Sequence, residues 1–149
     1  MKRITKRFEE LTSREIYEIG KLRSQVFVVE QKCIYLDLDG KDEKARHIYF
    51  LDEASNEIIC YCRVLEKGVT YETSSIGRVL TNPKYRGQGY ARKLLTMAIE
   101  IVRDIYKDSE ITIGAQSYLR EFYSSLGFKC ISDIYDEDGI PHIDMNLKF

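Results

Sequence analysis

The sequence predicts one α/β domain over residues 1–149, built on a mixed β-sheet of about seven strands. Three features carry this prediction. Strand-like and helix-like segments alternate from end to end, with no internal repeat, low-complexity tract or linker. Residues 76–95 run from a β-rich stretch through a glycine turn into an amphipathic helix, which is typical of a strand–helix unit. Asp138-Gly139, between two alternating segments, is a strong hairpin signal.

Composition narrows the class of protein. The chain has 149 residues, of which 44% are hydrophobic, enough for a core of its own. A net charge of −1 argues against a nucleic-acid-binding protein that works through bulk charge. The apolar runs are too short to span a membrane, and the N-terminus lacks the apolar stretch of a signal peptide. We therefore expect no membrane association and a cytoplasmic location.

The cysteines are predicted to be reduced thiols. Cys33, Cys60, Cys62 and Cys130 are too few and too scattered for a disulfide scaffold. Cys60-x-Cys62 lacks the two-residue spacing that zinc sites prefer, so no metal site is expected.

In the first half of the chain we expect a strand, a helix, a loop and a hairpin. Thr12 and Glu15 form a capping box, so the helix begins near Ser13 and carries an apolar stripe at helical spacing. It ends around residues 27–30, where β-branched residues gather. The expected strands cover residues 3–10, 47–51 and 57–65, and a polar turn joins the last two.

Residues 31–45 form a polar loop that is rich in acidic side chains, namely Asp37, Asp39, Asp42 and Glu43. Their spacing does not match an EF-hand calcium loop. Two interpretations stay open. The loop is either a solvated acidic surface segment or a rim that attracts a cationic amine substrate.

The second half alternates between strands and helices. A strand over 73–80 leads into a long helix over 87–106, and a strand over 110–115 follows. A right-handed crossover would make these two strands parallel. A short helix over residues 117–126 precedes the final hairpin, whose strands cover residues 128–135 and 140–147.

The turn before the long helix is predicted to bind phosphate. A helix N-terminus carries unpaired N–H groups and about half a positive charge, and two glycines let an anion approach the backbone. The flanking residues Lys84, Arg86, Arg92 and Lys93 add positive charge. The spacing fits neither a P-loop nor a dinucleotide fingerprint.

Two segments resemble the Gcn5-related N-acetyltransferase (GNAT) superfamily. Residues 86–91, RGQGYA, fit the pattern [QR]-x-x-G-x-[GA] of its acyl-CoA loop. Residues 116–128, QSYLREFYSSLGF, are similar to the segment N-x-x-A-x-x-x-[YF]-x-x-x-G-F, with Gln116 and Leu119 in place of Asn and Ala. Further stretches resemble the ElaA-like subgroup and cover nearly the whole chain: residues 22–23 with 26–31, 37–42, 75–79, 115–116 and 137–142.

The resemblance implies a GNAT-type fold, with about four helices around the sheet and central strands that splay apart. The pantetheine arm of acetyl-CoA would lie between these strands, held by the backbone of the first of them. A main-chain N–H near Leu80 would stabilise the thioester oxygen. The residues expected to bind the cosubstrate are Val79, Leu80, Thr81, Arg86, Gly87, Gln88, Gly89, Tyr90, Ala91 and Gln116.

The catalytic residues are also expected from the resemblance. Tyr123 matches the position of a general acid that faces the thiol, although the spacing alone equally fits a core aromatic residue. Many relatives carry a glutamate where this chain has Ser75. The substitutes considered for the base are Glu30, His47 and His142, each of which has a structural role as the alternative.

Two arginines on the predicted strands have open roles. Arg63 and Arg78 would either pair with Glu30 or Glu72 or hold a carboxylate of the substrate.

The implied function is transfer of an acetyl group from acetyl-CoA to a primary amine of a small molecule or peptide. The alternatives are a non-catalytic acyl-CoA-binding sensor or interaction module and a nucleotide-binding regulator. We expect acetyl-CoA and an amine as partners, and the exposed sheet edges would allow a homodimer.

Overall fold

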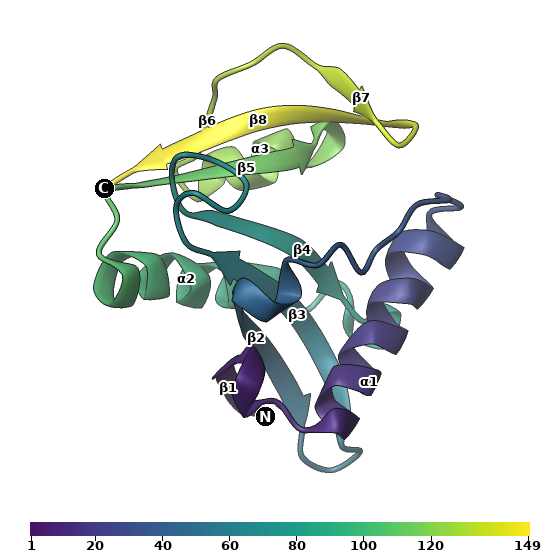
Figure 1. Ribbon diagram of the computed structural model, residues 1–149. Coiled ribbons are helices and arrows are strands. Elements are labelled where there is room, and N and C mark those ends of the chain that lie inside the picture. The colour runs from purple at the N-terminus through teal and green to yellow at the C-terminus, as the bar shows by residue number, and fades with distance from the viewer.

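The computed structural model describes all 149 residues, and its strands form two antiparallel sheets that fan apart (Figure 1). The first sheet has the order β1-β2-β3-β4, with β1 (Lys2–Arg7), β2 (Ala45–Asp52), β3 (Glu57–Leu65) and β4 (Ser75–Thr81). In the second sheet β8 lies between β5 and β6 and also pairs with β7. Its strands are β5 (Glu110–Gln116), β6 (Lys129–Cys130), β7 (Tyr135–Glu137) and β8 (Ile140–Lys148).

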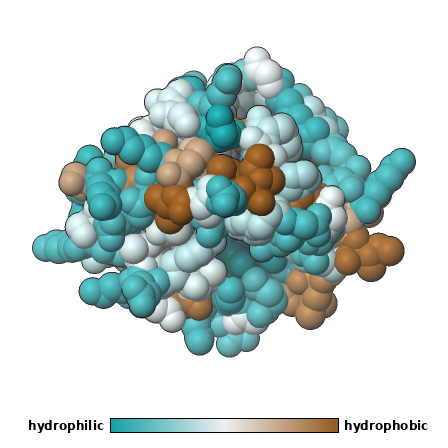
Figure 2. All heavy atoms as spheres, turned by 90° about the horizontal axis from the view of Figure 1, so that it is seen from above, coloured by the Kyte–Doolittle hydropathy of each residue, from teal (hydrophilic) through white to brown (hydrophobic).

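Three α-helices accompany the sheets: α1 (Ser13–Arg23), α2 (Tyr90–Ile101) and α3 (Arg120–Ser125). The first two continue into wider π-helical turns, Ser24–Glu30 and Val102–Tyr106. Short 3-10 turns occur at Phe8–Glu10, Asp42–Lys44, Pro83–Tyr85 and Ser117–Leu119. No helix combines the length and apolar character that crossing a membrane requires. Hydrophilic side chains cover most of the upper face, interrupted by separate apolar patches (Figure 2).

The two long helices cover opposite faces of the first sheet. On α1, Ile19 and Leu22 pack with Tyr49 and Tyr61, which point to one side of β2 and β3. The neighbouring residues on those strands point to the other side, where α2 lies. The core on that side joins α2 to both sheets and includes Ile48, Phe50, Cys60, Leu94, Leu95, Ala98, Ile113 and Met145.

The two sheets are joined at one end only. A parallel bridge pairs Ser74 with Ile111, and the N–H of Thr112 donates to the carbonyl of Ser74 at 2.9 Å. The hydroxyl of Thr73 donates to that of Thr112 at 2.7 Å. Beyond this bridge β4 and β5 belong to different sheets, which confirms both the parallel pairing and the splayed strands that were expected.

Several boundaries differ from the prediction. The strand expected over 128–135 splits into β6 and β7, so there are eight strands rather than seven. Helix α2 begins at Tyr90 and not at Gly87, because Gly87 and Gly89 have φ angles of 78° and 80°, outside the helical region. The structure has three α-helices where about four were expected, and the other helical segments are short 3-10 or π-type turns.

Candidate functional site

A cleft of about 690 Å³ opens where β4 and β5 diverge. Its walls come from both strands, from the segment after α1, and from the start of α3 and the β7–β8 turn. The residues that line it include Val79, Leu80 and Thr81 on β4 and Ala115 and Gln116 on β5. This cleft therefore lies between the two strands that were expected to splay.

The hydrogen-bond register of β4 determines which backbone groups face the cleft. The N–H of Asn82 donates to the carbonyl of Ile59 on β3 at 2.8 Å. Because hydrogen-bonded and non-bonded pairs alternate in an antiparallel ladder, Leu80 then bonds to β3, while Val79 and Thr81 point away from it. The N–H of Leu80, near which the oxyanion donor was expected, is thus directed at β3. The Thr81 carbonyl accepts a hydrogen bond from Arg86 Nε at 3.2 Å.

The middle of β4 carries a bulge. Tyr61 pairs with Leu80 and Arg63 with Gly77, so Arg78 and Val79 together oppose the single residue Cys62. Arg78 has a φ of 51°, which is uncommon for a residue with a side chain. A bulge leaves its extra residue unpaired and bends the strand, and bulges are frequent beside active sites.

The glycine loop lies at one end of the cleft. Gly89 is the N-cap of α2 and provides no side-chain acceptor for the first amides of the helix. No atom lies within 4 Å of the place where a Cβ would be on Gly87 or Gly89, so the loop is open above its backbone. Of the predicted loop residues, Arg86 and Ala91 line the cleft, whereas Gly87, Gln88, Gly89 and Tyr90 do not.

Arg86 is held by a carboxylate across the mouth of the cleft. Its Nη atoms donate to the two oxygens of Glu30 at 2.7 and 3.1 Å. Glu30 was considered as a base, and the structure places it in this bidentate ion pair. Gln116, expected to contact the cosubstrate, donates to the Gln31 side chain at 3.4 Å.

Tyr123 is buried on α3 and lines the cleft. Its ring packs edge-on against Phe122 and Phe128, with centroids 5.4 and 5.9 Å apart. Its hydroxyl makes no hydrogen bond within the protein. Burial raises the pKa of Tyr123 well above its ordinary value, so the phenol stays protonated and is available as a donor.

His142 lies on β8 and also lines the cleft. Its Nδ1 is 2.7 Å from the carbonyl of Ile140, which can only accept, so Nδ1 carries the hydrogen. The other nitrogen, Nε2, is therefore the one that can take up a proton. It lies 3.3 Å from the carboxylate of Glu137. Glu137 and Asp138 line the cleft, and neither pairs with a lysine or arginine.

His47 lies outside the cleft. Its Nε2 donates to the carbonyl of Asp42 at 2.9 Å, and its Nδ1 accepts from Tyr61 at 2.7 Å. Burial lowers the pKa of His47 and favours the neutral ring. With both nitrogens occupied, His47 is a structural residue in this arrangement, and we leave it out of the proposed chemistry.

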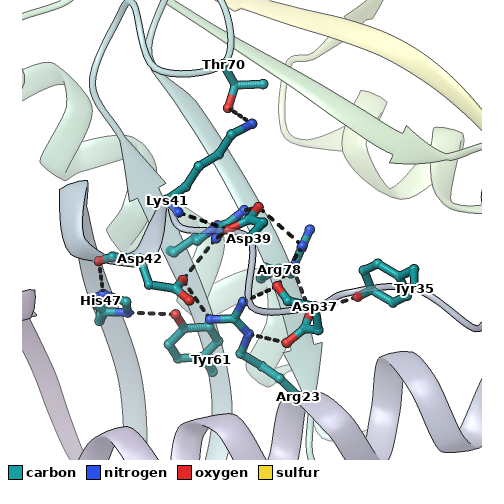
Figure 3. Close-up of polar contacts among 11 residues, drawn as sticks. Arg23, Tyr35, Asp37, Asp39, Lys41, Asp42, His47, Tyr61, Thr70 and Arg78 are labelled. Carbon is teal, nitrogen blue, oxygen red and sulfur yellow. Dashed lines mark hydrogen bonds and ion pairs between the residues drawn. The ribbon is translucent and has the colours of Figure 1, made fainter.

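The three aspartates of the acidic loop are bound by arginines and are not free to attract a cation, whereas Glu43 is exposed. Three arginines, Arg23, Arg63 and Arg78, bind its three aspartates. Figure 3 shows Arg23 and Arg78 beside the aspartates. Arg63 donates to Asp39 at 2.6 and 2.8 Å and to Asp42 at 2.9 Å. Pairing with Glu30 or Glu72 was one of the two roles left open for these arginines, and neither glutamate is a partner of Arg63 or Arg78. We call these six residues, Arg23, Asp37, Asp39, Asp42, Arg63 and Arg78, the arginine–aspartate cluster.

Burial raises the pKa of Asp39 and Asp42, yet the hydrogen bonds and charges of the arginines outweigh it and keep both pKa values below their ordinary range. The arginine–aspartate cluster was not predicted from the sequence, although one feature of the sequence pointed to it. Arg63 lies inside β3, EIICYCRVL, and is the only charged residue after Glu57 in that strand. A charge in such a buried strand requires a partner, and the acidic loop is the densest group of carboxylates in the first half of the sequence.

Comparisons with known proteins agree with this geometry. A family model described as "Acetyltransferase (GNAT) domain" matches residues 14–149. A UPF0039 protein of Schizosaccharomyces pombe is 40% identical over 146 residues, which is 97% of this chain and 95% of that protein. Protein ElaA of Escherichia coli is 37% identical over 136 residues, 91% of this chain and 89% of that protein.

Two solved structures have the same overall fold. The crystal structure of E. coli ElaA matches with a TM-score of 0.91 at 34% identity and covers 99% of both chains. An acyl-CoA N-acyltransferase from Pseudomonas aeruginosa also matches with a TM-score of 0.91, at 30% identity, and again covers 99% of both chains.

Proposed function

Because the chain belongs to the GNAT acetyltransferase family, we propose that it transfers an acetyl group from acetyl-CoA to a primary amine. The observation that carries this proposal is the cleft between β4 and β5, with the glycine loop at one end and the unpaired hydroxyl of Tyr123 inside it. The family match and the similar solved structure of an acyl-CoA N-acyltransferase support acyl transfer in general.

The cosubstrate is proposed to lie along β4. The diphosphate of CoA contacts the first amides of α2 above Gly87 and Gly89, where the open backbone and the helix dipole favour an anion. The pantetheine arm bonds to the outward backbone groups of Val79 and Thr81. The alternation of the ladder favours the N–H of Val79, rather than that of Leu80, as the donor to the thioester oxygen.

The amine must lose a proton before it attacks. A lysine-like ammonium has a pKa of about 10.4, so about one molecule in 2,500 is neutral at pH 7, and deprotonation costs about 4.6 kcal/mol. We assign the proton to Nε2 of His142, with Glu137 beside it. The amine nitrogen then attacks the thioester carbon, the C–S bond breaks, and the second proton of that nitrogen passes to the departing sulfur. Tyr123 donates a hydrogen bond to the sulfur as it leaves.

A coupled assay of CoA release with a panel of amines tests the proposal. We expect turnover with at least one amine, a loss of about tenfold or more in kcat for Tyr123→Phe, and nearly unchanged affinity for acetyl-CoA. Tight acetyl-CoA binding without turnover on any amine would instead favour the non-catalytic sensor. Equal thermal stabilisation by ATP and CoA would favour the nucleotide-binding regulator.

His142 has its own test. We expect His142→Asn to lower kcat by about 10²-fold or more and to leave the affinity for acetyl-CoA nearly unchanged, because the variant side chain cannot take up the amine proton. A variant that keeps the wild-type kcat would contradict the assignment of His142 as the base.

A further inference from the structure

We propose that Arg78 is a positioning residue for acetyl transfer. Clamped by Asp37, it holds β4 in the bulged conformation that presents the N–H of Val79 to the thioester. This inference rests on the proposed function. It gives a role in the reaction to the arginine–aspartate cluster, which takes no part in the chemical steps proposed above.

The conformation of Arg78 is the first line of evidence. Its φ of 51° lies in the left-handed region, which disfavours any residue with a side chain. The bulge that it forms takes Arg78 and Val79 out of the ladder with β3. The bulge also lies three residues beyond Ser75, just past the bridge that joins the two sheets, so the bend it introduces falls where β4 leaves β5.

The contacts of the Arg78 side chain are the second line of evidence. Its Nε lies 2.8 Å from a carboxylate oxygen of Asp37, and one Nη donates to the Asp37 carbonyl at 3.0 Å. A second carboxylate, that of Asp39, lies 3.4 Å away, and the guanidinium stacks over the ring of Tyr35 at 5.4 Å. The guanidinium is thus held from several directions by one segment of the chain (Figure 3).

Asp37 is itself fixed to the first helix. Arg23, whose side chain is 2% exposed, donates from Nε to the Asp37 carboxylate at 2.8 Å and from Nη2 to its carbonyl at 3.0 Å. The Tyr35 hydroxyl donates to the other carboxylate oxygen at 2.8 Å. The clamp therefore connects the end of α1 to the bulge of β4, and a residue far from the reacting atoms would set the direction of a backbone N–H.

The test compares two substitutions of the same residue. Arg78→Gly removes the clamp but adopts the left-handed conformation without steric cost, whereas Arg78→Ala removes the clamp and keeps that cost. We expect Arg78→Ala to lower kcat by about tenfold and to leave the KM for acetyl-CoA within about twofold. We expect Arg78→Gly to recover most of the wild-type kcat.

Lys107 provides a matched control. It also has a left-handed φ, 53°, and a long basic side chain, but it follows the π-helical turn Val102–Tyr106 and does not line the cleft. Lys107→Ala should leave kcat unchanged. If Arg78→Gly is as slow as Arg78→Ala, the charge of Arg78 and not the backbone conformation matters, and the inference fails. It also fails if Arg78→Ala keeps the wild-type kcat.

A second pair of variants tests whether Asp37 acts through Arg78. Asp37→Asn should lower kcat in the wild-type background and have no further effect in the Arg78→Gly background. Equal effects in both backgrounds would overturn the proposed connection. If Asp37→Asn does not fold, Tyr35→Phe, which removes one of the hydrogen bonds to Asp37, replaces it in the same cycle.

A readout without catalysis separates this inference from the proposed function. NMR couplings report the φ angle of residue 78, and hydrogen exchange reports whether the Val79 amide lies outside the ladder. We expect Arg78→Ala to lose the left-handed φ and to slow exchange at Val79. If no amine is acetylated, the proposed function fails, while these two measurements still decide whether the clamp holds the bulge. Unchanged couplings and exchange in Arg78→Ala would contradict it.

Discussion

At the scale of single residues, buried charge organises the region beside the cleft. Arg23 is almost completely buried and yet carries a full charge, which is stable only because Asp37 and Asp42 bind it at 2.8 and 2.7 Å. The three arginines and three aspartates of the cluster balance in charge. Residues 34–40, which include Asp37 and Asp39, make no backbone–backbone hydrogen bond, so these side chains fix their position.

Removing one buried member should be far more costly than removing an exposed ion pair. We expect Arg23→Met to lower the free energy of unfolding by about 3–5 kcal/mol, because two carboxylates lose a buried partner. Urea unfolding measures the change. Arg103→Met, which breaks the exposed pair with Asp104, serves as the control and should leave the unfolding midpoint nearly unchanged. Equal effects of the two substitutions would refute this account of the cluster.

At the scale of elements, Glu15 joins three segments at the start of α1. Its carboxylate accepts hydrogen bonds from the N–H of Thr12, from Lys6 on β1 and from the hydroxyl of Tyr49 on β2. Burial opposes ionisation of this carboxyl, but the three hydrogen bonds outweigh it and lower the pKa of Glu15 to about 2.

This pKa predicts an acid-sensitive connection between α1 and the first sheet. Because the pKa of Glu15 is lower in the folded protein than the ordinary value of 4.5, ionised Glu15 stabilises the fold above about pH 4.5. That stabilisation is lost as the pH falls from 4.5 towards 2. We expect Glu15→Gln to reduce the pH dependence of the unfolding free energy in this window, as measured by denaturant unfolding at several pH values.

Glu18→Gln is the matched control for this prediction. Glu18 lies on the same helix but forms only an exposed pair with Lys21, 3.6 Å away. The Glu18→Gln variant should retain the wild-type pH dependence of the unfolding free energy, to which Asp39 and Asp42 also contribute. An unchanged pH profile in Glu15→Gln would show that Glu15 does not make this connection.

Elements defined by neighbouring residues could be predicted from the sequence. The capping box of Thr12 and Glu15 and the glycine turn before α2 have local causes, and the structure has both where they were expected. The bulge at Arg78 could not be predicted, because its conformation depends on Asp37, 41 residues away in the chain. Ile16 and Ile105 lie at helical spacing from buried residues of the same helices, but the structure leaves both exposed.

In the candidate site, too, features with a local sequence motif could be predicted, and features that depend on distant neighbours could not. The loop sequence and Tyr123 were predicted through resemblance to known motifs, and both lie at or in the cleft. Choosing among Glu30, His47 and His142 required coordinates, because only their neighbours separate them. Glu30 is bound by Arg86, His47 has both nitrogens occupied, and His142 lines the cleft.

At the scale of the whole molecule, α2 makes the two sheets one unit. The sheets share a single bridge, but Leu94, Leu95 and Ala98 are fully buried in a core that contains residues of both. A helix that packs on two sheets holds them together while leaving the other side of β4 and β5 free to diverge. The cleft can therefore be open without dividing the protein into two cooperative units.

This arrangement predicts that the two sheets unfold together. Leu95→Ala should lower the unfolding free energy by about 2–5 kcal/mol, because it leaves a cavity in the shared core. Amide signals of β2 and β8, followed by NMR in urea, should disappear at the same denaturant concentration. Thr96→Ala, at an exposed position next to it, should change little. Separate transitions for β2 and β8 would contradict the shared core.

The central claim is that this cleft binds acetyl-CoA, with its phosphates on the glycine loop. Calorimetric titration of acetyl-CoA tests it most directly, using the wild type, Gly89→Asp and the matched variant Gly68→Asp, whose glycine is also left-handed and open but lies outside the cleft. We expect one acetyl-CoA per chain, at least tenfold weaker binding to Gly89→Asp because a carboxylate faces the diphosphate, and wild-type affinity for Gly68→Asp. No heat of binding to the wild type, or equal affinity of all three proteins, would contradict the claim.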